Sequence, residues 1–176
     1  MVKEKEQFFI EWIGEEFYSK DDRAISLANN KNYGEFKEGR VIYSQVEVLF
    51  LVEKNTALLR KSKKIIKFRE LIDKLSKKDK KVNINLLVFK DLRGRGYILK
   101  TALKFGADFR VYERNQKPGE EHAKWILYCI KESDVLRWQD FAAKNRVAHS
   151  TKKKLLVAIV DEENDITYYE VKWLRP

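Results

Sequence analysis

The chain has 176 residues, of which 44% are hydrophobic and 12% aromatic, so it is not a disordered polymer and can form one core or two small ones. Lys and Arg number 37 against 27 Asp and Glu, which gives a formal net charge of +10. An excess of this size favours a polyanionic partner, although the solvated Lys/Glu-rich surface of a thermophilic protein has the same composition.

The composition also indicates where the protein works. Its one cysteine, Cys129, lies in an apolar run and cannot form an internal disulfide, as expected in a reducing compartment. No apolar run approaches the ~20 residues of a membrane helix, and no small-residue cleavage site follows the N-terminus. We therefore expect a cytoplasmic protein with no membrane partner.

The first half of the chain predicts a small α+β domain. Short apolar runs alternate with turn clusters over residues 7–52, as in short strands. Ser44 and Glu47 fit a capping box, so Ser44 is expected to begin a helix and is not taken as a nucleophile. A second amphipathic helix is expected over 68–75, and the charged run 76–81 after it divides the chain into domains 1–80 and 81–176.

The second half begins with a segment that alternates basic and apolar residues. Over 91–105 this spacing predicts a helix with a basic outer side and a buried inner side. Gly106 is expected to take the left-handed conformation that ends a helix, and residues 107–112 alternate with period two, as a half-buried strand does.

The remaining elements follow from turn and cap signals. Pro118-Gly119 predicts a loop over 115–121, which delivers His122 to the start of a strand at 125–130. Ser133 is expected to cap a helix over 134–145. The apolar run 155–160 predicts a strand buried on both faces, and 166–173 an edge strand that can pair with another chain.

Three residue types in this half could together cleave RNA through its own 2′-hydroxyl. That reaction needs a base for the hydroxyl, an acid for the departing 5′-oxygen and a cation for the phosphoryl oxygens. Tyr112, His122 and Lys153 supply one candidate for each role, provided that the fold brings them together. A phenol is a poor base at neutral pH unless a neighbouring cation favours its ionised form, and Lys153 is a candidate for that cation.

Each of these residues also has an ordinary structural interpretation. Tyr112 can be a packing residue at a strand end, His122 an exposed loop residue, and Lys153 part of a solvated lysine run. His149, the second histidine, can close the preceding helix. Trp173, near the chain end, could stack on an unpaired base.

Metal chemistry has weaker support in the sequence. There is no HExxH motif, no pair of cysteines and no dense carboxylate cluster. Glu170 and Lys172 have the E-x-K order of one class of metal-dependent nucleases, but Glu35 and Lys37 have the same order. We expect neither a metal nor a cofactor.

Four separate blocks, in order, closely resemble the catalytic domain of archaeal tRNA-splicing endonucleases. They read DLRGRGY at 91–97, KFGADFRVY at 104–112, EHA at 121–123 and RVAHSTKKK at 146–154. The resemblance spans about residues 82–173, and Tyr33-Gly34 with the Ser44 helix resembles the smaller N-terminal domain more loosely. It implies an α+β protein: a small N-terminal mixed α/β domain, then an α/β nuclease domain whose central mixed sheet is flanked by helices.

The resemblance also implies a function and roles for individual residues. It implies a metal-independent endoribonuclease that cuts precursor tRNA at a bulge-helix-bulge and leaves 2′,3′-cyclic phosphate and 5′-hydroxyl ends. Tyr112 would be the general base, His122 the general acid and Lys153 the charge stabiliser, while His149 would be structural. Arg146 and Trp173 would pinch a flipped-out bulge base.

The resemblance further implies a tetramer, built as a dimer of dimers joined through C-terminal strands. The loop before His122 has mixed charge, which leaves open a homotetramer and a heterotetramer with a paralogous structural subunit. Two other functions stay open: a non-catalytic basic RNA-binding or structural subunit, and a metal-dependent nuclease using Glu170 and Lys172.

Overall fold

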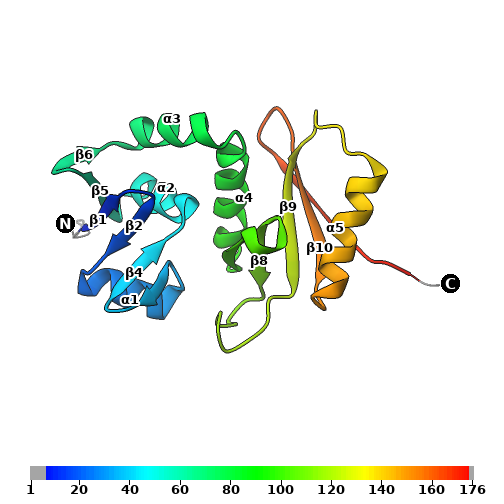
Figure 1. The fold of residues 1–176 in the computed structure, drawn as a ribbon, viewed down its shortest axis with the longest axis horizontal. Helices are drawn as coiled ribbons and strands as arrows, with labels where there is room; N and C mark the ends of the chain where they lie inside the picture. The colour runs from blue at the N-terminus through cyan, green and yellow to red at the C-terminus, as the bar shows by residue number, and fades with distance from the viewer. Residues whose placement is uncertain (1–6, 175–176) are drawn as a thin grey trace. The chain divides into compact units, whose positions relative to one another are not determined.

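The computed structural model describes residues 7–174, and the chain divides into two compact units, Met1–Leu86 and Leu87–Pro176. Each unit contains one mixed sheet with α-helices packed against it, which confirms the predicted α+β class (Figure 1). The division between the units falls within a helix, α4 (Val82–Gly94). Across the described residues, no helix has both the length and the apolar character needed to cross a membrane.

The first unit contains a six-stranded sheet in which one pair of strands, β1 and β5, is parallel and the other neighbours are antiparallel. The strand order is β3-β4-β2-β1-β5-β6. The strands are β1 (Phe8–Ile13), β2 (Glu16–Ser19), β3 (Glu35–Lys37), β4 (Arg40–Tyr43), β5 (Ala57–Lys61) and β6 (Lys64–Ile66). The helices are α1 (Asp22–Lys31), α2 (Gln45–Glu53) and α3 (Phe68–Lys78).

The predicted capping box at the start of α2 is present. The Ser44 hydroxyl accepts from the Glu47 backbone N–H, and the Glu47 carboxylate accepts from the Ser44 backbone N–H at 3.0 Å. Val46, Val48, Leu49 and Leu51 are all buried, so α2 is apolar on several sides and belongs to the core. The predicted helix at 68–75 is α3, which continues three residues further to Lys78.

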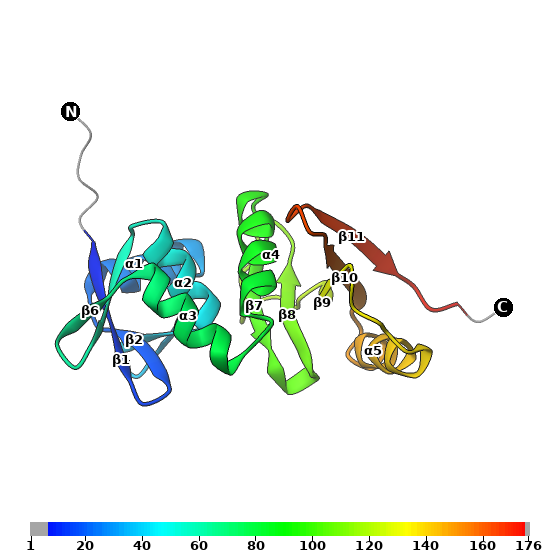
Figure 2. The ribbon, with the colours of Figure 1, turned by 90° about the horizontal axis from the view of Figure 1, so that it is seen from above.

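The second unit contains a five-stranded sheet with the order β11-β10-β9-β8-β7. Only β9 and β10 are parallel. Its elements after α4 are β7 (Ile98–Ala102), the 3₁₀ turn η1 (Leu103–Phe105), β8 (Ala107–Tyr112), β9 (Trp125–Lys131), α5 (Trp138–Ser150), β10 (Lys154–Val160) and β11 (Ile166–Val171). In the second unit, β11 forms one edge of the sheet, as predicted for that segment (Figure 2).

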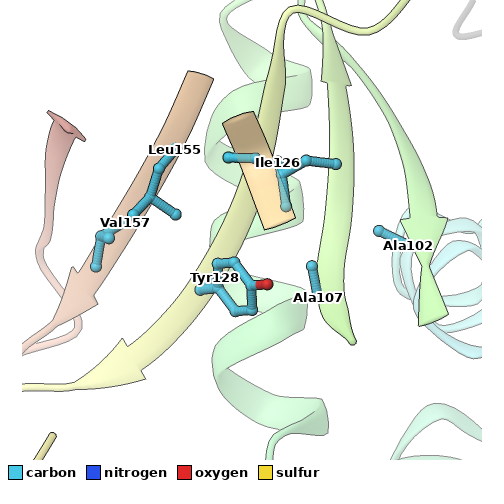
Figure 3. Close-up of a cluster of buried hydrophobic side chains, with 7 residues drawn as sticks. Ala102, Ala107, Ile126, Tyr128, Leu155 and Val157 are labelled. Carbon is cyan, nitrogen blue, oxygen red and sulfur yellow. The ribbon is translucent and has the colours of Figure 1, made fainter. Parts of the chain in front are cut away.

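Helices cover both faces of this second sheet. One face packs against α5 through a cluster that contains Ile126, Tyr128, Leu155 and Val157 of the sheet and Ala148 of the helix (Figure 3). On the other face, the ring of Phe89 in α4 lies 6.1 Å from that of Phe109 in β8. The buried sheet is therefore a rigid support for side chains at its edges.

Two predicted helices have wrong boundaries, each at both ends. The helix expected over 91–105 ends at Gly94, because the backbone N–H groups of Gly96 and Tyr97 turn back to Arg93 and Leu92, closing a Schellman motif with Gly96 at φ +91°. Residues 98–102 form β7, which the sequence did not indicate because four of its five residues are buried and show no alternation.

The helix expected over 134–145, with Ser133 as its cap, runs instead over Trp138–Ser150 with Arg137 at the N-cap position. Asp134 closes a turn by accepting from the Lys131 backbone N–H at 2.9 Å. The predictions for Gly106, at φ +62°, and for strands β8, β9 and β10 are confirmed.

Candidate active site

Tyr112 is the last residue of β8 and is largely buried, with 4% of its surface exposed. It pairs with Ile98 of β7, and these two residues form a small buried cluster with Ala123. The strand ends here because the chain turns into the loop before β9, where Glu113 N–H donates to the Gln116 side-chain oxygen at 2.9 Å. The ring of Tyr112 is therefore held between Ile98 and Ala123.

His122 lies at the end of that loop, three residues before β9, and its side chain is exposed. The next two residues anchor it: Ala123 is buried against Tyr112, and the Lys124 backbone N–H donates to Val111 O at 2.9 Å. His122 therefore directly precedes a residue, Ala123, that packs against Tyr112.

Lys153 is placed by the end of α5. The Lys152 N–H donates to His149 O at 3.0 Å and the Lys153 N–H to Ala148 O at 2.8 Å, with Lys152 left-handed at φ +54°. This is a Schellman motif, which reverses the chain sharply after the helix. The Lys153 ammonium donates to Thr151 O at 2.9 Å, and β10 begins at the next residue.

The three predicted catalytic residues lie where β8 ends and β9 and β10 begin, a place that we call the strand junction. Lys124 connects these strands: its N–H donates to Val111 O, and its C=O accepts from the Lys154 N–H at 3.0 Å. Tyr112 directly follows Val111 and Lys153 directly precedes Lys154. The parallel pairing of β9 with β10 produces this arrangement, because it brings the starts of both strands to the edge where antiparallel β8 ends.

Strand register also puts Tyr112 and Lys153 toward the same side of the sheet. Arg110, Ile126 and Leu155 stand in register across β8, β9 and β10 and share one face. Tyr112 follows Arg110 by two residues and Lys153 precedes Leu155 by two, so both continue that face by alternation. This is the face that α5 covers.

Arg146 and Trp173, the predicted base-pinching pair, line one cavity of about 500 Å³. Arg146 comes from α5, and Trp173 from the segment after β11. The His149 ring meets the Trp173 ring edge-on, with centroids 4.7 Å apart at 89°. His149 therefore contacts the tryptophan and lies outside the strand junction that holds Tyr112, His122 and Lys153.

On the other face of the sheet, an ion-pair network beside the strand junction was missed by sequence reasoning. Glu170 of β11 accepts from Lys154 Nζ and from Trp125 Nε1, each at 2.8 Å, and these hydrogen bonds, that from Lys154 foremost, lower the pKa of the Glu170 carboxyl. Glu113 and Lys124 form a further ion pair, whose hydrogen bond raises the pKa of Lys124.

The sequence block at 91–97 has a structural role, because Asp91 and Arg95 in it hold strand β11. The Tyr168 hydroxyl of β11 donates to the Asp91 carboxylate at 2.7 Å, and Arg95 pairs with the same carboxylate at 2.9 Å. Burial, together with this hydrogen bond, raises the pKa of Tyr168. These contacts fasten the edge strand to α4.

The alternative metal site has little support in the geometry. Within residues 7–174, no three His, Cys, Asp or Glu side chains converge as a set of metal ligands. Glu170 is engaged with Trp125 and Lys154, and Lys172 lies 3.8 Å from it, while Glu35 and Lys37 form a simple surface pair at 2.6 Å.

Comparison with known proteins identifies the family. Residues 82–168 match the model of the tRNA intron endonuclease catalytic C-terminal domain. A tRNA-splicing endonuclease of Pyrococcus abyssi is 40% identical over 163 residues, which cover 92% of this chain and 94% of the relative. The tRNA-splicing endonuclease of Thermococcus onnurineus is 37% identical over 172 residues, which cover 97% of this chain and 99% of the relative. That of Methanothermobacter thermautotrophicus is 41% identical over 153 residues, which cover 87% of this chain and 89% of the relative.

The family model and the relatives together define this protein as an endoribonuclease. More specifically, the chain belongs to the tRNA-splicing endonuclease family, as its four sequence blocks predicted.

Proposed function

We propose that this chain is the catalytic subunit of a tRNA-intron endonuclease, which cleaves precursor tRNA at bulge-helix-bulge splice sites without a metal ion. Tyr112 is the general base, His122 the general acid, and Lys153 the cation that stabilises the phosphoryl oxygens. The observation that supports these roles best is the strand junction at Lys124, where the ends that carry all three residues meet.

The reaction needs only proton transfers and charge stabilisation. The phenolic oxygen of Tyr112 takes the proton of the 2′-hydroxyl as the 2′-oxygen attacks phosphorus. The bond to the 5′-oxygen breaks as that oxygen receives the proton of His122. The products are a 2′,3′-cyclic phosphate and a 5′-hydroxyl, and the Lys153 ammonium balances the additional negative charge on the phosphoryl oxygens during the transfer.

Cleavage of a bulge-helix-bulge RNA in excess EDTA tests the mechanism. We expect the same single-turnover rate with and without the chelator, because every catalytic role is assigned to a side chain. End analysis should find a cyclic phosphate, which a phosphatase removes only after acid or a cyclic phosphodiesterase has opened the ring. Loss of cutting in EDTA, restored by added Mg²⁺, would transfer the chemistry to a metal site and refute these assignments.

The cavity between α5 and the C-terminal segment is the proposed holder of the flipped bulge base. A base placed there would lie between the Arg146 guanidinium and the Trp173 ring, and the edge-on contact with His149 orients that ring. Such a clamp recognises the shape of the bulge with little dependence on its sequence.

Replacing Arg146 by alanine should weaken productive binding of the bulge by about tenfold, the scale of one lost base stack. The measurement is the protein concentration that gives half-maximal single-turnover cleavage. Arg137→Ala is the matched control, because it removes the same charge from an exposed position just before α5, outside this cavity. Equal effects of the two substitutions would reduce Arg146 to a general electrostatic contribution.

We further propose that the active enzyme is a dimer of dimers, because one catalytic domain makes only one of the two cuts. β11 supplies an edge strand on which another subunit can pair. The loop before His122 carries both signs of charge, with Lys117 and Glu120 3.9 Å apart. The mass of the purified assembly, with and without a co-expressed paralogue, distinguishes a homotetramer from a heterotetramer.

A further inference from the structure

The first unit has a groove of about 910 Å³ that belongs to neither the strand junction nor the base clamp. It lies over the exposed side of β1, β2 and β5. Residues of β1 alternate in burial, with Phe8 and Ile10 in the core and Phe9 and Ile13 exposed at 39% and 62%. A volume near the upper end of the usual range for ligand sites, about 300–1,000 Å³, suits an extended ligand.

Aromatic rings in and around the groove each lie beneath a cation. The Arg60 guanidinium carbon is 4.8 Å from the Phe9 ring centre, and that of Arg40 is 5.0 Å from the Tyr18 ring. Strand register explains this arrangement, because Glu11 of β1 is in register with both Tyr18 and Arg60 and the three share one face. Arg60 also pairs with the Glu11 carboxylate, which orients the guanidinium.

A basic rim surrounds these rings. The two-residue turn between β5 and β6, Ser62-Lys63, has positive φ at both residues, which is the geometry of a tight type I′ hairpin. The turn presents Lys63 next to Lys61, whose ammonium lies 3.8 Å from the Trp12 ring centre. Four basic side chains line the groove against two acidic ones: Lys20, Arg60, Lys61 and Lys63, against Glu11 and Asp21.

Both acidic side chains already have cationic partners. Glu11 pairs with Arg60, and Asp21 pairs with Arg23 at 2.6 Å. The groove therefore presents a net positive charge beside aromatic rings, of which Phe9 is exposed at 39% and Tyr18 is half-buried. An exposed sheet surface that combines aromatic rings with cations is a recurrent way to hold unpaired nucleotides, because bases stack on the rings while cations follow the phosphates.

We infer that this groove is a second RNA site, which binds a single-stranded segment of RNA by stacking on Phe9 and Tyr18 and by phosphate contacts from Lys61 and Lys63. The inference rests on the proposed function only in taking RNA as the ligand. It assigns to the N-terminal unit a role in holding unpaired nucleotides away from the cleavage chemistry.

The test is fluorescence anisotropy of the full chain with a labelled single-stranded oligouridylate. Phe9→Ala should weaken binding by about tenfold. Phe36→Ala, which removes an exposed ring of the same unit outside the groove, should change it by less than about twofold. Lys63→Ala should lower the salt slope by about 0.7, one phosphate contact on a single strand.

Crosslinking with 4-thiouridine in the same oligonucleotide locates the contact, and thermal melting checks that each variant is folded. Crosslinks within residues 9–20 or 58–64 of the wild-type chain support the groove. Crosslinks confined to residues 87–176, or equal affinities for the Phe9→Ala and Phe36→Ala chains, overturn it. If Phe9→Ala changes the mass of the assembly but leaves RNA affinity unchanged, the inference is also overturned, because the groove would then be a protein interface.

The two proposals fail separately. A chain that binds the oligonucleotide through Phe9 but never cuts a bulge-helix-bulge RNA contradicts the proposed function and leaves the groove standing. A chain that cuts normally and binds RNA without any dependence on Phe9 contradicts the groove as an RNA site and is consistent with the proposed function.

Discussion

Single-turnover cleavage by the His122→Ala chain is expected to be slower than that of the unmodified chain by about two to four powers of ten. The substitution removes the proton donor for the departing 5′-oxygen, which would otherwise leave as an unprotonated alkoxide. The side chain is exposed, so its loss leaves no cavity. RNA affinity should stay within a few-fold, and the measurement is the rate at saturating protein over roughly pH 5 to 8.

Imidazole added to the His122→Ala reaction provides a control specific to proton transfer. A free imidazole can act as the missing acid, so the rate should rise with its concentration, whereas the Lys153→Ala chain should show no such rise. A His122→Ala chain that cuts at the normal rate throughout this pH range would falsify the assignment of the acid.

Tyr112→Phe is the second substitution with a large expected effect, again about two to four powers of ten in the single-turnover rate. It removes only the hydroxyl oxygen that accepts the 2′ proton. The ring remains in place between Ile98 and Ala123, so the buried cluster and the loop that follows should keep their structure. Circular dichroism and RNA affinity should therefore match those of the unmodified chain.

Tyr128→Phe is the matched control for this experiment. Tyr128 is a buried tyrosine of the same sheet, and it packs under α5, away from the strand junction. Its loss of a hydroxyl should change the cleavage rate by less than about twofold. If both tyrosine substitutions slow cleavage equally, the effect of Tyr112 is one of packing and the base must be sought elsewhere.

The fold was predictable wherever a local signal decides the structure. Ser44 with Glu47 predicts the start of α2, and Gly106 predicts the turn before β8, because cap and turn chemistry depend on a few neighbouring residues. β7 was not predictable in this way. Four of its five residues are buried, so its pattern lacks the alternation of a half-buried strand.

The candidate site was predictable as a set of residue types but not as a place. The motifs named Tyr112, His122 and Lys153, yet they are separated along the chain by ten and thirty-one residues. Their common position depends on the parallel pairing of β9 with β10 across the α5 connection, a long-range contact that no local pattern encodes. Lys124 joins these strands through its backbone N–H and C=O, groups that every residue type except proline carries, so its identity gave no indication of this role.

The junction at Lys124 separates the positions of the catalytic residues from the sequence of the loop at 115–121, so that the loop can change while those positions stay fixed. Its hydrogen bonds and the buried methyl group of Ala123 fix the chain just after His122, whereas residues 115–121 contribute none of these bonds. That loop can exchange charges, lengthen or shorten while the reacting groups keep their positions. In the proposed dimer of dimers, a subunit contact made through this loop can therefore change at little expense to turnover.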